Sequence, residues 1–104
     1  MQLGRPKPDK DIRTVALCAG SGGSVFKSLP KDIDALFTGE LSHHEVLAAV
    51  ENDKYVILCG HSNTERGYLA VLQRKLQSHL DEDYMESEIE VIRSRVDSDP
   101  LEMI

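Results

Sequence analysis

Three short apolar segments, each followed within two residues by a glycine, constrain the fold of this chain more than any other feature. They are residues 14–18, 35–38 and 55–59. Each is of strand length and almost continuously apolar, which is typical of strands covered on both faces. Helical patterns lie between them, and this alternation predicts an α/β fold: a mostly parallel sheet flanked by helices.

The helices are predicted from apolar periodicity and from residues that end helices. A short helix is expected over residues 24–29, because Pro30 would stop it. A second helix carries one apolar stripe, formed by Val46, Leu47 and Val50. A longer helix carries leucines at helical spacing, which we expect to belong to the core: Leu69, Leu72, Leu76 and Leu80.

The two ends of the chain are less regular. Its 104 residues predict one compact domain, which we place at residues 13–104. Residues 1–12 form a lead-in, in which residues 1–3 are expected to be a remnant strand. Residues 89–92 alternate between apolar and polar, which suits an edge strand, and a flexible loop is expected at residues 81–87.

Charge and cysteine content narrow the class of protein. The formal net charge is −6, with the acidic residues concentrated after residue 80, and there is no tryptophan. Nucleic-acid binding is not expected, because phosphate contacts need clustered basic residues. Cys18 and Cys59 each end an apolar run, where a buried thiol acts as a small hydrophobe. No segment could span a bilayer, so we expect a soluble, cytoplasmic protein, with the nucleus or mitochondrion as alternatives.

Polar residues of ligand type follow each apolar segment. The three loops are residues 20–24, 39–45 and 60–66. In a parallel α/β sheet, ligands gather at the carboxyl ends of the strands, so the loops are expected to converge on one rim. Backbone N–H groups of the first loop could contact an anion or substrate through Gly20, Ser21 and Gly22. The geometry of a tight turn explains that loop equally well.

His61 and Glu65 are the best candidate pair of metal ligands. A histidine just before a helix and a carboxylate in its first turn can reach one cation. The alternative is a capping box formed by Ser62 and Glu65, in which Glu65 only satisfies an N–H group. A zinc or iron site usually needs at least three protein ligands, so the pair is insufficient alone.

His43 and His44 are a weaker candidate. Adjacent residues of a helix point about 100° apart, so only one of the two would face a given site. Ser42 and Glu45 have the spacing of a capping box, and a polar first turn of a helix is common. We expect a substrate role or a supporting role near a metal more than direct ligation.

Together these motifs resemble the C-terminal region of the NGG-interacting-factor-three-like (NIF-three-like) family, also known as GTP cyclohydrolase type-two homologues. The matching segments are residues 15–24, 38–45, 60–67 and 97–101. The likeness covers roughly residues 13–104, and four motifs in the family's order make it specific. The chain would therefore be a partial NIF-three-like domain.

The resemblance implies a dinuclear site for divalent metal ions such as zinc or iron, within an oligomeric assembly. His61 and Glu65 match the family's C-terminal ligand motif. Other residues resemble the lining of the same cleft: Gly20, Ser21, Gly22, Thr38, Glu40, His43, His44 and Thr64. The family's remaining ligands lie in an N-terminal half without a counterpart here, since the first histidine is His43. A homo-oligomer or a partner N-terminal half is expected to supply them.

Two functions from different classes follow. The first is a metal-dependent hydrolase acting on a nucleotide or other small substrate, with the isolated chain inactive. The second is a non-catalytic protein-interaction module that retains the fold. A third outcome is a truncated chain that does not fold stably, because cutting the parent fold exposes sheet edges and apolar surface.

Overall fold

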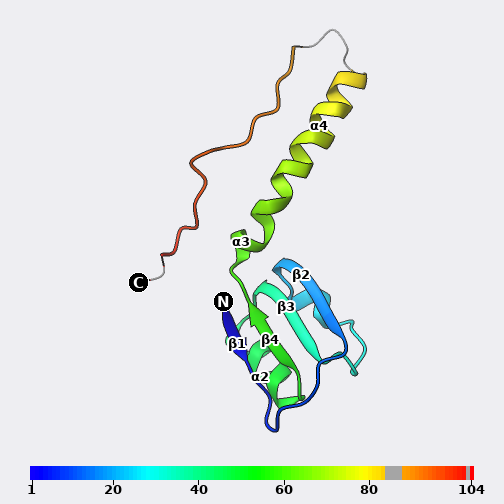
Figure 1. Ribbon diagram of the computed structural model, residues 1–104, viewed down its shortest axis with the longest axis vertical. Helices are drawn as coiled ribbons and strands as arrows, with labels where there is room; N and C mark the ends of the chain where they lie inside the picture. The colour runs from blue at the N-terminus through cyan, green and yellow to red at the C-terminus, as the bar shows by residue number, and fades with distance from the viewer. Residues whose placement is uncertain (84–87, 103) are drawn as a thin grey trace. The chain divides into compact units, whose positions relative to one another are not determined.

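The sheet predicted from the three apolar segments forms the first part of the chain (Figure 1). The computed structural model describes residues 1–83, 88–102 and 104. It divides into two units, Met1–Thr64 and Glu65–Ile104. In chain order the elements are β1 (Gln2–Gly4), β2 (Val15–Ser21), α1 (Gly23–Phe26), β3 (Ala35–Glu40), α2 (His43–Glu51), β4 (Tyr55–Leu58), α3 (His61–Glu65), the 3-10 helix η1 (Arg66–Tyr68) and α4 (Leu69–Asp83).

The sheet has the strand order β1-β4-β3-β2. Strands β2, β3 and β4 are parallel, which confirms the predicted α/β class. Residues near the N-terminus form β1, which pairs antiparallel with β4 at the edge of the sheet. Because β2, β3 and β4 are parallel, their carboxyl ends lie at the same end of the sheet, where the polar loops begin.

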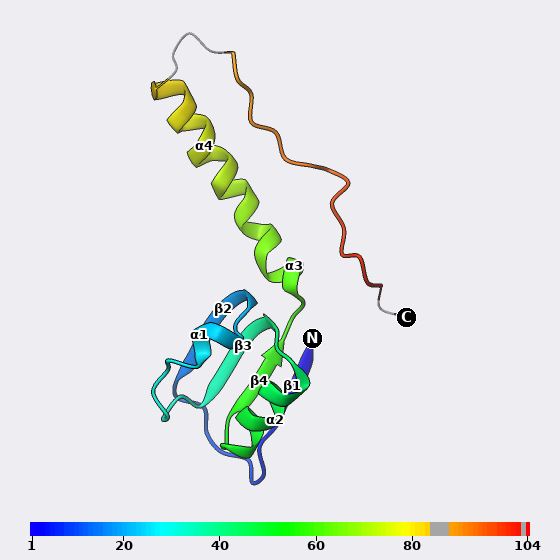
Figure 2. The same cartoon turned by 180° about the vertical axis from the view of Figure 1, so that it is seen from behind.

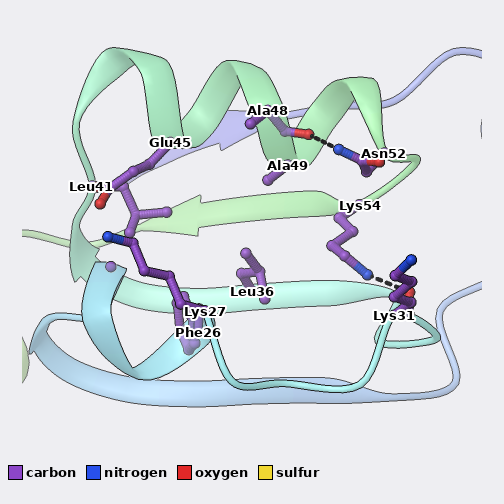
Figure 3. Close-up of a pocket in the computed structure, with 11 residues that line it drawn as sticks. Phe26, Lys27, Lys31, Leu36, Leu41, Glu45, Ala48, Ala49, Asn52 and Lys54 are labelled. Carbon is purple, nitrogen blue, oxygen red and sulfur yellow. Dashed lines mark hydrogen bonds between the residues drawn. The ribbon is translucent and has the colours of Figure 1, made fainter.

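Helices α1 and α2 cover one face of this sheet (Figure 2). The core lies beneath them and centres on Leu36, Ala49 and the fully buried Val56. Burial of a side chain such as Val56 stabilises a fold by roughly 1.5–3 kcal/mol. A pocket of about 440 Å³ lies between α1 and α2, over Leu36 of β3 (Figure 3).

The opposite face of the sheet carries a row of apolar side chains. Leu17, Phe37, Ile57 and Leu3 are register partners on neighbouring strands. Leu17 is 74% exposed, because both helices that pack on the sheet within Met1–Thr64 lie on the other side. The expectation that all three strands are covered on both faces is therefore wrong for this unit. Likewise Cys18 and Cys59 are free and only half-buried, not buried as expected.

In the second unit, a segment predicted as an edge strand is bonded by glutamine side chains and not by a neighbouring strand. Residues 89–92 are not a strand; their backbone is bonded instead by Gln73 and Gln77 of α4. Gln73 Nε2 donates to Val91 O (2.7 Å), and Val91 N donates to Gln77 Oε1 (2.7 Å). The alternation of apolar and polar residues fitted an edge strand. The backbone groups of this segment, however, form their hydrogen bonds with side chains of α4.

Helix α4 also differs from expectation, because none of its residues is buried. Of the leucines expected in the core, Leu69, Leu72 and Leu76 are exposed and Leu80 is half-buried. The helix continues to Asp83, through part of the predicted loop; the rest of that loop, residues 84–87, lies outside the described residues. In the part of the chain that the structure describes, no helix has the length and apolar character needed to cross a membrane.

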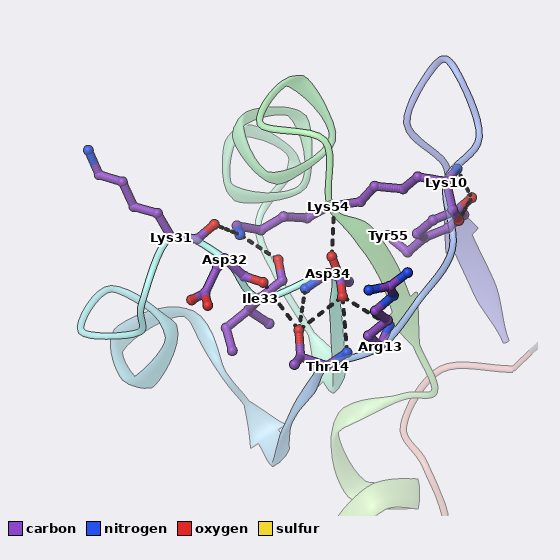
Figure 4. Close-up of polar contacts among 9 residues, drawn as sticks. All are labelled: Lys10, Arg13, Thr14, Lys31, Asp32, Ile33, Asp34, Lys54 and Tyr55. Atoms are coloured by element: carbon purple, nitrogen blue, oxygen red, sulfur yellow. Dashed lines mark hydrogen bonds and ion pairs between the residues drawn. The ribbon is translucent and has the colours of Figure 1, made fainter.

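Asp34 joins the N-terminal segment to the start of β3 (Figure 4). Its carboxylate accepts hydrogen bonds from the backbone N–H groups of Arg13 (2.9 Å) and Thr14 (3.0 Å). Lys10 Nζ donates a further bond at 3.0 Å. These donors, first the Arg13 backbone and then Lys10, hold the pKa of the Asp34 carboxyl far below its ordinary value.

Replacing Asp34 by asparagine should therefore destabilise the chain in a pH-dependent way. A carboxyl whose pKa is lower in the folded than in the unfolded state stabilises the fold while it is ionised. That stabilisation is complete above about pH 5 and declines as the pH falls below about 4. Urea unfolding should show a deficit for Asp34→Asn at neutral pH that narrows in acid. Asp32→Asn is the matched control, and a deficit for Asp34→Asn that does not change with pH would contradict the assignment.

Candidate functional site

Three glycines bring the ends of β2, β3 and β4 into close contact. Gly60 N donates to Gly39 O at 2.8 Å. A Cβ atom built on Gly39 would lie 2.5 Å from Gly20 O and 2.7 Å from Gly60 O. Gly20 and Gly60 have positive φ angles of 70° and 93°, a conformation that glycine adopts without steric cost. The loops that were expected to share one rim thus begin side by side.

Thr38 and Thr64 bond the backbone of this rim together. Thr38 is fully buried, and its hydroxyl donates to Gly20 O at 3.2 Å. Gly20 N in turn donates to Thr64 Oγ1 at 2.8 Å, across 44 positions of sequence. Thr64 Oγ1 also lies 2.8 Å from His61 O, within hydrogen-bonding distance. These hydrogen bonds fix the backbone conformation around His61.

His61 meets a carboxylate at the rim, and that carboxylate belongs to Glu40. His61 Nδ1 lies 2.8 Å from Glu40 Oε1. The two side chains are 44% and 58% exposed, respectively, so solvent and a ligand can both reach them. Glu40 is the last residue of β3, and His61 is the first residue of α3 after the neighbouring strand β4. The two residues are 21 positions apart in the sequence, so only the adjacency of β3 and β4 could have predicted this pair.

Helix α3 contains both members of the predicted ligand pair. It begins at His61 and ends at Glu65, whereas His61 was expected before the helix and Glu65 in its first turn. Side chains four residues apart lie on the same face of a helix, so the spacing remains suitable for binding one metal ion. The alternative capping box requires Ser62 just before the helix, whereas Ser62 is the second residue of α3. Gly60 precedes the helix, and its carbonyl accepts from Thr64 N at 3.2 Å.

His43 and His44 open α2. The predicted capping box is confirmed: Ser42 Oγ accepts from Glu45 N (3.2 Å), and Glu45 Oε2 accepts from Ser42 N (2.8 Å). Both histidines are exposed, and their rings meet edge to face with centroids 5.6 Å apart. In the first loop Ser21 is exposed, while Gly22 is buried and precedes the four-residue helix α1.

The described residues supply only part of a complete metal site. Within residues 1–83, 88–102 and 104, no three or more His, Cys, Asp or Glu side chains are grouped so that they could hold a metal ion. A structural or catalytic zinc-type site uses three or four protein ligands. A metal bound through His61 and Glu65 would therefore need additional ligands.

Comparison with known sequences gives consistent matches along the chain. The family model for Duf34/NIF3 (NGG1p interacting factor 3) matches residues 2–100. The Protein NIF3 homolog of Schizosaccharomyces pombe is 54% identical over 94 residues, which are 89% of this chain and 32% of that protein. The NGG1-interacting factor 3 of Saccharomyces cerevisiae is 51% identical over 90 residues, 86% of this chain and 29% of that protein. The human NIF3-like protein 1 is 46% identical over 96 residues, 92% of this chain and 24% of that protein.

Solved structures show the same fold at lower identity. A Bacillus cereus protein related to NIF3 superimposes with a TM-score of 0.72 and 23% identity, over 99% of this chain and 28% of that one. A Staphylococcus aureus protein gives the same score and identity, over 99% of this chain and 33% of that one. The chain thus spans about a third or less of the length of these relatives, and corresponds to the C-terminal part of the longer family members. It belongs to the Duf34/NIF3 (NGG1p interacting factor 3) family.

Proposed function

We propose that this chain contributes His61 and Glu65 to a dinuclear site for divalent metal ions, and that the complete site hydrolyses a nucleotide or another small substrate. Zinc and iron suit an imidazole together with a carboxylate. The remaining ligands would come from a second polypeptide segment, either an N-terminal half or another copy in a homo-oligomer. The isolated chain is expected to be inactive. Two free cysteines suit a reducing compartment such as the cytoplasm.

The contact between Glu40 and His61 is the observation that carries this proposal. Histidines that bind metals almost always place their other ring nitrogen against a carboxylate, a backbone carbonyl or water. Here Nδ1 is the atom that meets Glu40 Oε1, at 2.8 Å. A metal would therefore be coordinated through Nε2, with the carboxylate fixing the tautomer and raising the basicity of the imidazole.

Hydrogen bonds of the backbone around His61 hold its imidazole in this position. His61 follows Gly60, whose backbone is bonded to Gly39, and the His61 carbonyl lies next to the Thr64 hydroxyl. Glu65 lies one helical turn further along α3. When bound, the metal supplies Lewis-acid polarisation of a carbonyl or phosphoryl oxygen. The residues of this chain hold the metal and keep the coordinating imidazole in one orientation.

Removing the charge of Glu40 tests the proposal. Glu40→Gln should weaken binding of zinc about 10–100-fold, the usual cost of losing the partner of a metal-binding histidine. Glu40→Asp should recover part of that loss, because it restores the carboxylate at a shorter reach. The measurement is competition against a metal-binding dye, with the chain combined with an N-terminal half that supplies the remaining ligands. Glu51→Gln, which neutralises the exposed last residue of α2, is the matched control. Wild-type affinity in Glu40→Gln would contradict the role given to Glu40.

A second function, protein interaction without catalysis, is favoured by the face of the sheet that α1 and α2 leave uncovered within Met1–Thr64. In the apolar row of Leu17, Phe37, Ile57 and Leu3, Leu17 and Leu3 are exposed and the other two are half-buried. Exposed apolar patches commonly mark interaction sites. The Saccharomyces cerevisiae relative is named for interaction with NGG1. Loss of capture of the chain by NGG1 in Leu17→Glu would support this function. The absence of any change in the NMR signals of His61 on addition of zinc would favour it over metal binding. Capture that is unaffected by Leu17→Glu would count against it.

A further inference from the structure

The pocket between α1 and α2 has the size and lining of a small-molecule site. Its volume of about 440 Å³ falls within the range of about 300–1,000 Å³ that is typical of ligand pockets. Phe26, Leu36, Leu41 and Ala49 give it an apolar lining. None of the residues proposed to hold or orient the metal lines this pocket, so its occupant is a separate question.

Two ammonium groups lie at opposite ends of the pocket (Figure 3). Lys27 reaches one end, beside Leu41 and Glu45, and Lys54 lies at the other. In the described part of the chain, neither lysine forms an ion pair with a carboxylate. Glu45 is the acidic residue in the lining, and its carboxylate is already bonded to Ser42 N in the capping box of α2.

Lys54 is the better placed of the two cations. It is half-buried, and its Nζ donates to Lys31 O (2.7 Å) and Ile33 O (2.6 Å). These two bonds fix the ammonium at the end of the pocket without neutralising its charge, because both acceptors are uncharged carbonyls. An ammonium has three N–H donors, so one donor remains for a ligand. A partly desolvated cation without a counter-ion favours an anionic partner.

We propose that this pocket binds a small organic carboxylate, with its carboxylate on Lys54 and an aromatic or branched body over Leu36 and Ala49. Charge complementarity selects the anion, since the lining carries three lysines and one glutamate. The apolar lining selects the body, because water leaves the surfaces of both partners on binding. Inorganic anions and short carboxylates lack this second contribution and bind weakly.

The test is an NMR titration of the chain with naphthalene-2-carboxylate, compared with naphthalene-2-methanol and acetate. The carboxylate should shift the amide signals of pocket residues and bind about tenfold tighter than the alcohol, the worth of one charge-assisted hydrogen bond. Acetate should bind more weakly than either, and added salt should weaken the carboxylate selectively. Equal affinity for the acid and the alcohol, shifts located elsewhere, or no binding by any of the three would overturn the proposal.

Two variants separate the charge of the pocket from its shape. Lys54→Met removes the ammonium and keeps the apolar stem, so it should bring the affinity for the acid down to that for the alcohol. Ala48→Leu adds bulk to the lining from α2 and should abolish binding of both probes while leaving the charge in place. Lys7→Met, in the exposed N-terminal segment, is the matched control for loss of a lysine. Unchanged selectivity in a folded Lys54→Met, or unchanged binding in Ala48→Leu, would overturn the assignment.

Discussion

Replacing Gly39 by alanine is expected to lower the free energy of unfolding by about 3 kcal/mol, near the upper end of the usual cost of overpacking. The added Cβ would lie 2.5 Å from Gly20 O, 2.7 Å from Gly60 O and 2.7 Å from Thr64 Oγ1. Two of these atoms belong to the backbone of neighbouring strand ends, so a change of rotamer cannot relieve the overlap. The strands must separate where the rim is formed, and the position of His61 would change with them.

Gly67→Ala is the matched control, because a Cβ atom on Gly67 would meet nothing within 4 Å. It should leave stability unchanged or raise it by up to about 1 kcal/mol, through lower entropy of the unfolded chain. Urea unfolding followed by circular dichroism compares the two variants with the wild type. Equal midpoints for Gly39→Ala and the wild type would show that the strand ends are not packed as closely as described.

The second large effect is expected on metal binding. His61→Ala and Glu65→Ala should each weaken zinc binding by more than about 100-fold, since loss of a ligand costs more than loss of its supporting carboxylate. If both side chains bind the same ion, the double variant should lose little beyond either single variant. Dye competition at neutral pH measures all three affinities, with each variant chain combined with an N-terminal half that supplies the remaining ligands.

His79 offers a control with the same spacing. His79 Nε2 lies 3.0 Å from Asp83 Oδ2, so α4 also carries a histidine and a carboxylate four residues apart. Unlike His61, which begins the helix that follows β4 in the chain, His79 lies near the end of α4. His79→Ala should therefore leave zinc affinity unchanged. An equal loss in His79→Ala and His61→Ala would indicate unspecific binding by exposed histidines.

The parallel sheet and its rim were predictable because both follow from patterns within short segments of the sequence. Residues 14–18, 35–38 and 55–59 are apolar runs ended by glycine, and parallel pairing then places their following loops at one edge. The capping box of α2 was predictable for the same reason, since Ser42 and Glu45 are three residues apart. Local patterns of this kind do not depend on what packs against them.

Features set by partners distant in sequence were not predictable. The contact between Glu40 and His61 depends on the register between β3 and β4, and the pKa of Asp34 depends on donors about 20 residues away. The apolar character of Leu17 predicted a buried strand, yet within Met1–Thr64 the helices cover only the other face. The alternation of residues 89–92 predicted a strand, but Gln73 and Gln77 supply the bonds that a neighbouring strand would make.

The most direct test of the metal site is the ¹⁵N NMR signal of the His61 ring during titration with zinc, on the chain combined with an N-terminal half that supplies the remaining ligands. Coordination through Nε2 predicts that this nitrogen shifts strongly and saturably, while Nδ1 keeps its proton toward Glu40. No saturable change at His61, or coordination through Nδ1, would contradict the proposed site.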